Sequence, residues 1–144
     1  MRHASCGARV APHLAMAHHQ TLGLIVRLSF AKILLHLEGL AVLVGSLVAY
    51  RELGDSWGKF FVLFLAPDLG MLGYLASPEL GSKTYNLFHT YFSPFLLWLF
   101  VYFVHWPSLS SICLIWVAHI GFDRLLGYGL KYPTQFKDSH LNRV

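Results

Sequence analysis

The stretch WVAHIGFDRLLGYGLKYP, residues 116–133, decides how the chain is expected to fold. Its first half continues a long apolar run that is typical of a membrane-spanning helix, and Gly127 and Gly129 then end that helix. Within the apolar run lie His119 and Asp123, one helical turn apart. Ionisable side chains are costly inside a bilayer and mark a functional site by default. The stretch therefore predicts a membrane-spanning helix that carries part of a site.

The composition of the whole chain agrees with this interpretation. Hydrophobic residues make up 56% of its 144 residues and charged residues only 12%, about half of the charged fraction of a soluble domain. The formal net charge is +4, but the lysines and arginines cluster at the ends of apolar runs, as they do in membrane proteins. We therefore expect an integral membrane protein with the lipid bilayer as its partner, and no binding of nucleic acid.

Four apolar runs predict an all-α, four-helix membrane bundle, with spans over residues 33–50, 60–76, 85–104 and 109–127. Each run is near the ~20 residues that a helix needs to cross the hydrocarbon. Residues 1–32 form a variable N-terminal tail, for which we expect disorder over residues 1–20 and a short membrane-surface helix over residues 21–32. Residues 33–127 form the membrane domain, and residues 128–144 form a C-terminal tail.

The basic residues predict the orientation of the spans. They lie before the first run, between the second and third, and at or after the end of the fourth, but not in the turn between the third and fourth: Arg27, Lys32, Lys83, Arg124, Lys131, Lys137 and Arg143. The loop between the first and second runs carries Arg51 and Lys59 beside Glu52 and Asp55, although acidic residues count little in this rule. The positive-inside rule then places both termini in the cytoplasm. We expect a multi-pass protein of the inner membrane.

Five ionisable residues lie inside the predicted spans: Glu38, Asp68, His89, His119 and Asp123. Antiparallel helices with a rise of ~1.5 Å per residue would place Glu38, Asp68, His89 and His119 roughly 8–12 Å from the cytoplasmic ends of the spans, and Asp123 about one turn nearer the cytoplasm than His119. Pro67, directly before Asp68, leaves a backbone carbonyl without its helical donor and so opens a polar position there. We therefore predict that the five side chains converge in the cytoplasmic half of the bundle.

Small residues predict which face of the first span packs against its neighbours. Glu38 is followed by Ala41, Gly45 and Ala49, a spacing that lets helices approach closely in membranes. This face would turn Glu38 into the bundle.

Three functions remain open for this polar layer. In the first, Asp68, His89, His119 and Asp123 bind a divalent metal such as zinc, which activates water, and Asp123, His119 and Glu38 are catalytic. Asp123 would then orient the ring of His119 through the ring nitrogen that is not bound to the metal. In the second, the same groups form a proton or ion relay. In the third, they only fix helix packing in a structural or accessory subunit that has a protein partner or forms a homo-oligomer.

Four motifs carry a resemblance to a known family: HLEGLAVL, LFLAPDLGMLGYL, YNLFHTY and WVAHIGFDRLLGYGLKYPTQFKDSHL. Together they resemble the bacterial domain-of-unknown-function family 4260, whose members are small polytopic membrane proteins. The resemblance runs from about residue 35 to the C-terminus and includes all five ionisable residues of the layer. It implies four spans and no defined reaction. His36, where relatives tend to carry arginine, and the tail before residue 21 depart from the family.

A second similarity is confined to one motif. APDLG, residues 66–70, is similar to the Pro-Asp motif of small membrane-bound metal-dependent hydrolases. Gly70 and Met71 stand where those proteins carry a further aspartate and histidine.

The C-terminal segment KYPTQFKDSHL, residues 131–141, allows two interpretations. It could fold under the bundle, adding Asp138 and His140 as ligands or relay groups, or it could remain solvated with its lysines near anionic lipid. Arg124, at the end of the fourth span, is expected to be a membrane-surface anchor.

Overall fold

The computed structural model describes the backbone of residues 12–143 and the side chains of residues 30–143. This part of the chain is helical, as expected, and it contains no strand. The α-helices are α1 (Pro12–Glu52), α2 (Trp57–Phe64), α3 (Pro78–Phe88), α4 (Phe92–Phe103) and α5 (Ser110–Leu126), and the 3₁₀ segments are η1 (Ala66–Leu75), η2 (Pro107–Leu109) and η3 (His140–Asn142). An isolated antiparallel bridge joins Lys131 and Ser139.

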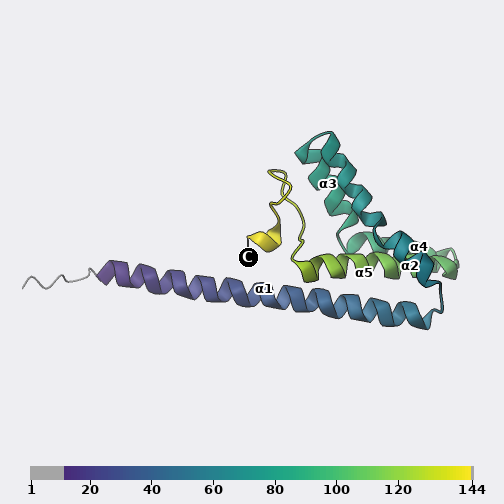
Figure 1. Ribbon diagram of the computed structural model, residues 1–144, viewed down its shortest axis with the longest axis horizontal. Helices are drawn as coiled ribbons and strands as arrows, with labels where there is room; N and C mark the ends of the chain where they lie inside the picture. Colours follow the sequence, from purple (N-terminus) through teal and green to yellow (C-terminus); the bar gives the residue numbers. More distant parts are fainter. Residues whose placement is uncertain (1–11, 144) are drawn as a thin grey trace, which may run out of the picture.

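Helices α1 and α5 lie antiparallel and side by side (Figure 1). Two glycines allow their backbones to touch: a Cβ on Gly39 would lie 2.6 Å from the backbone nitrogen of Leu125, and one on Gly121 would lie 2.8 Å from that of Leu43. Gly45, by contrast, is exposed and has nothing within 4 Å of its Cβ position. The predicted seam through Ala41, Gly45 and Ala49 is therefore wrong, because the packed face of α1 passes through Gly39.

Prolines break two of the predicted spans. Helix α2 ends at Phe64, and the chain continues through Pro67 as the 3₁₀ segment η1. Helix α3 ends at Phe88, and α4 begins two residues before Pro94. A proline ring clashes with the carbonyl four residues earlier and offers no N–H, so Pro94 opposes a helix that continues through residue 90. Because of these breaks, η1 and α3 form a hairpin that rises away from α1 and α5 (Figure 1).

Three segments of the described chain are long and apolar enough to cross a membrane: Phe30–Glu52, Trp57–Leu75 and Pro107–Leu126. The span expected over residues 85–104 is instead divided between α3 and α4, and α4 has only 12 residues. The surface helix expected over residues 21–32 is continuous with the first span, and residues 12–20, for which disorder was expected, also belong to α1. Residues 1–11 lie outside the described part.

The C-terminal tail docks onto α3. The side-chain amide of Asn86 donates to the carbonyl of Lys131 at 2.9 Å, and its oxygen accepts from the Lys131 N–H at 2.6 Å. Nδ1 of His140 accepts from the backbone N–H of Leu130 at 2.8 Å, and Leu141 is fully buried. Of the two interpretations of the tail, the docked one is therefore correct.

Candidate metal centre

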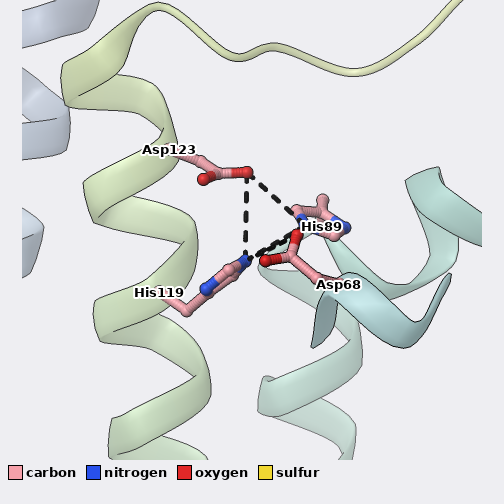
Figure 2. A group of neighbouring side chains, drawn as sticks. All are labelled: Asp68, His89, His119 and Asp123. Carbon is pink, nitrogen blue, oxygen red and sulfur yellow. Dashed lines mark hydrogen bonds and ion pairs between the residues drawn. The ribbon is translucent and has the colours of Figure 1, made fainter. Parts of the chain in front are cut away.

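Four of the predicted site residues meet where the hairpin joins α5. Asp68 lies near the start of η1, His89 caps the C-terminal end of α3, and His119 and Asp123 lie one turn apart on α5. Figure 2 shows the four side chains pointing toward one another from these elements. Both proline breaks thus contribute directly to the site, because each places one of these residues at a corner beside α5.

The distances among the four side chains are short enough for a single metal ion to reach all of them. The Nε2 atoms of His89 and His119 lie 3.1 Å apart. Nε2 of His89 lies 3.4 Å from a carboxylate oxygen of Asp68 and 3.4 Å from one of Asp123. For Nε2 of His119 the same distances are 3.6 Å and 3.9 Å, and all four ligand atoms lie within 4.8 Å of one another. Metal–ligand bonds of about 2.0–2.1 Å in a tetrahedral site place the ligand atoms ~3.3 Å apart, so this group has the size of such a site.

The ring of His89 is fixed in the orientation that a metal ligand needs. Its Nδ1 lies 2.9 Å from the backbone carbonyl of Tyr85, which can only accept, so Nδ1 carries the proton. The lone pair of Nε2 therefore faces the cluster. The ring of Tyr85 stacks on His89 with a centroid separation of 3.7 Å. Arg124 donates to the carbonyl of His89 at 3.1 Å and to that of Tyr128 at 2.8 Å, so it ties the end of α3 to the end of α5. Its role as a membrane-surface anchor stays a prediction.

Asp123 does not orient His119 in the way the sequence suggested. Its Oδ2 lies on the Nε2 side of the ring, 3.9 Å away, and accepts a hydrogen bond from the hydroxyl of Tyr85 at 3.0 Å. Nδ1 of His119 has no hydrogen-bond partner in the described part of the chain, and the ring packs edge-on against Phe64 at 5.3 Å. Residues four apart on a helix share one face, so Asp123 points into the same cluster as His119 instead of supporting its ring from behind.

The remaining candidates lie elsewhere. Glu38 is exposed on α1 and is not part of the group. It neighbours Gly39, the residue that packs against α5, and consecutive residues of a helix differ in direction by about 100°. Asp138 forms an ion pair with Arg143, whose guanidinium Nε lies 2.8 Å from Oδ1. Nδ1 of His140 accepts a hydrogen bond from the backbone N–H of Leu130. Neither tail residue reaches the cluster.

A cavity of about 300 Å³ opens beside the cluster, and Asp68, His119 and Asp123 line it together with Tyr85 and Lys131. Asp68 is the most accessible of the four, with 30% of its side chain exposed against 13% for Asp123, 2% for His119 and 1% for His89. Lys131 is buried, and its ammonium lies 5.2 Å from the ring centre of Tyr85 and 4.7 Å from that of Phe136. Burial lowers the pKa of Lys131 below its usual value, and the charge of Asp123 opposes this shift.

Sequence reasoning did not identify Tyr85 and Lys131 as site residues. Tyr85 lies four residues before His89 and so shares its helical face, which is a signal that could have found it. Lys131 reaches the cavity because the side chain of Asn86 binds the tail to α3. The local sequence around Lys131 does not predict that contact.

Comparison with known families identifies the one to which this chain belongs. The sequence profile of the family described as "Domain of unknown function (DUF4260)" matches residues 32–144. A search of the curated proteins found no match, and a search of the solved structures found none either. The matched range includes every residue of the cluster, together with Tyr85 and Lys131. The chain therefore belongs to domain-of-unknown-function family 4260, the family that its motifs resemble.

Proposed function

We propose that this chain is a membrane-embedded enzyme that binds one divalent transition-metal ion, Zn²⁺ above all, at Asp68, His89, His119 and Asp123, and uses it to activate water for hydrolysis. The observation that carries the proposal is the 3.1 Å approach of the two Nε2 atoms, each of which also faces both carboxylates. Imidazole and carboxylate ligands in a roughly tetrahedral arrangement suit zinc.

A metal accounts for this arrangement better than a relay or a packing role does. The Nε2 atoms of His89 and His119 face each other and can share only one proton between them. Few N–H donors then remain for the carboxylates of Asp68 and Asp123. Burying uncompensated negative charge is costly. A divalent cation between the four groups would neutralise both carboxylates and accept both nitrogen lone pairs.

The cavity favours a catalytic metal over a structural one. Structural zinc sites are closed by four protein ligands, whereas catalytic sites keep three and bind water at the fourth position. His89, His119 and Asp123 are the well-buried ligands, and Asp68 is the exposed one that could give way to water or take its proton. A catalytic zinc lowers the pKa of its bound water to about 7.

We further propose that the chain crosses the inner membrane four times, with α3 and α4 together making the third crossing and both termini in the cytoplasm. The antiparallel contact of α1 with α5 supports this topology. Gly39 lies against Leu125, so the start of the first proposed span lies beside the end of the last one. The two ends of the chain would then be on the same side of the membrane. Lys83 and the basic residues of the tail would then lie on the cytoplasmic side.

Elemental analysis of the detergent-purified protein tests the metal proposal. We expect close to one zinc or other transition metal per chain, and loss of it in His89→Gln, His119→Gln and Asp123→Asn. His105→Asn is the matched control, because it removes an exposed imidazole far from the cluster and asparagine tolerates its φ of 52°. Wild-type protein without stoichiometric metal, or an equal loss in the control, would contradict the proposal.

A further inference from the structure

We propose that the cavity beside the metal centre binds a phosphate ester of an apolar chain, and that Lys131 binds its negatively charged head. This inference rests on the proposed metal function and names the substrate class of that site. Lys131 is a positioned cation, the wall of the cavity is apolar, and the opening lies among apolar side chains of two candidate spans.

The ammonium of Lys131 is held in place without an ion pair in the described part of the chain. Its backbone is clamped on both sides by the amide of Asn86, and its Nζ lies over the rings of Tyr85, Tyr128 and Phe136 at 4.7–5.7 Å. Nζ forms no hydrogen bond or ion pair with the residues that the structure describes. Aromatic faces stabilise the ammonium, but they neither neutralise it nor give its N–H donors a charged acceptor. The cavity that Lys131 lines is where an anion would accept from them.

The other wall of the cavity is apolar and reaches the surface that would face lipid. Phe64, Leu65, Phe122 and Leu126 line it, and the last three are 62%, 37% and 54% exposed. Leu65 belongs to the candidate span Trp57–Leu75, and Phe122 and Leu126 belong to the candidate span Pro107–Leu126. A hydrocarbon chain could therefore stay in the bilayer while its head enters the cavity from the side.

A phosphate head fits this pair of positive groups better than a carboxylate does. A carboxylate has two oxygens and one negative charge, whereas a phosphate monoester has three non-bridging oxygens and close to two negative charges, so one oxygen can bind the metal and another can accept from the ammonium with charge for both. With two carboxylates and one divalent ion, the centre itself is neutral, and Lys131 supplies the net positive charge of the cavity. Lysine is a common phosphate-binding residue for this reason.

The test is calorimetric titration of dodecyl phosphate into the zinc-loaded full-length protein in dodecyl maltoside, with the metal content of each sample measured in parallel. Dodecyl maltoside is present in excess and has the same alkyl chain on a neutral head. Binding of dodecyl phosphate above this background therefore measures recognition of the phosphate head. We expect saturable binding that weakens about tenfold or more in Lys131→Gln and is largely retained in Lys131→Arg. Lys137→Gln is the matched control, because Lys137 lies exposed on the same tail. The metal content should not change in any of the three variants.

Other results would overturn the inference, and each would remove a different part of it. Equal affinity for inorganic phosphate would show that the head alone is recognised, and equal affinity for dodecanoate would show that the head need not be phosphate. An unchanged affinity in Lys131→Gln, or an equal loss in Lys137→Gln, would remove Lys131 from the site. Loss of metal in Lys131→Gln would make the lysine a structural residue. If Lys131→Gln fails to fold, the wild type alone tests the charge of the head. The inference is then overturned if dodecyl trimethylammonium binds to the wild type as tightly as dodecyl phosphate does. Absence of metal from the wild type contradicts the proposed function itself.

Discussion

The hydroxyl of Tyr85 donates to the same carboxylate oxygen of Asp123 that faces His89, over 3.0 Å. The backbone carbonyl of Tyr85 accepts from Nδ1 of His89, and its ring stacks on the imidazole. A single residue of α3 thus positions one proposed ligand on its own helix and another on α5. Groups that hold metal ligands from behind in this way commonly change metal affinity without touching the metal.

Tyr85→Phe should therefore weaken metal binding and leave the fold in place. The substitution keeps the stacked ring but removes the hydrogen bond to Asp123, and we expect the dissociation constant for zinc to rise by about 10–100-fold. Competition with a fluorescent chelator measures the change. Tyr74→Phe is the control, because the hydroxyl of Tyr74 is buried without a hydrogen-bond partner in the described part of the chain. If Tyr85→Phe binds zinc like the wild type, the hydroxyl has no role in the site.

A second prediction concerns the contact between α1 and α5. Gly39→Ala would push a methyl group to 2.6 Å from the backbone nitrogen of Leu125 and 2.8 Å from the carbonyl oxygen of Gly121, neither of which can rotate away. We expect the free energy of unfolding to fall by about 3 kcal/mol. Gly45→Ala, on the same helix, meets nothing within 4 Å. It should change stability by no more than about 1 kcal/mol, in the stabilising direction. Thermal unfolding in detergent compares them, and similar midpoints for the two variants would contradict the packing of α1 on α5.

The same contact explains why the sequence analysis misplaced Glu38, although it predicted the four members of the cluster. Periodicity and hydropathy locate a helix and the depth of each residue along it, which was enough for His119 and Asp123 on α5. Rotation about the helix axis is set by the partner helix, and α1 offers small residues on two faces. Gly121 on α5 selects the face of Gly39, and Glu38 turns outward. The break between α3 and α4 was predictable in principle, because Pro94 lies inside the expected third span.

Reporter fusions test the proposed topology. A reporter attached after Val144 should be cytoplasmic, and one inserted between His105 and Pro107 should be exported, because the turn between α4 and α5 carries no lysine or arginine. Alkaline phosphatase, active only outside the cytoplasm, and a fluorescent protein, active only inside it, give opposite signals at each site. An exported C-terminal fusion would invert the orientation and place the proposed metal site in the other half of the membrane.

Docking of the C-terminal tail should depend on pH through His140. Burial, with the nearby charge of Arg124, lowers the pKa of His140 below its usual value of 6.5. Nδ1 accepts from the N–H of Leu130, and a protonated ring has no lone pair for that bond. The undocked tail therefore takes up a proton before the docked tail does, so docking is fully favourable above about pH 6.5 and is lost progressively as the pH falls below it. Asp138 does not add to the pH dependence of docking near pH 6.5, because its hydrogen bond with Arg143 lowers its pKa below 3.8 and it stays charged.

Hydrogen exchange of the tail amides measures this dependence. The N–H groups of Leu130, Tyr132 and His140 are bonded within the docked tail, and their protection, corrected for the intrinsic exchange rate at each pH, should fall several-fold between pH 7.5 and pH 5.5. In His140→Gln the protection should be the same at both values, because glutamine can accept the Leu130 N–H without titrating. The amides of α5 serve as the internal reference, since their bonds lie within the helix. Protection that falls equally in His140→Gln would assign the effect to another group, and protection that stays constant in the wild type would show that the tail docks independently of His140.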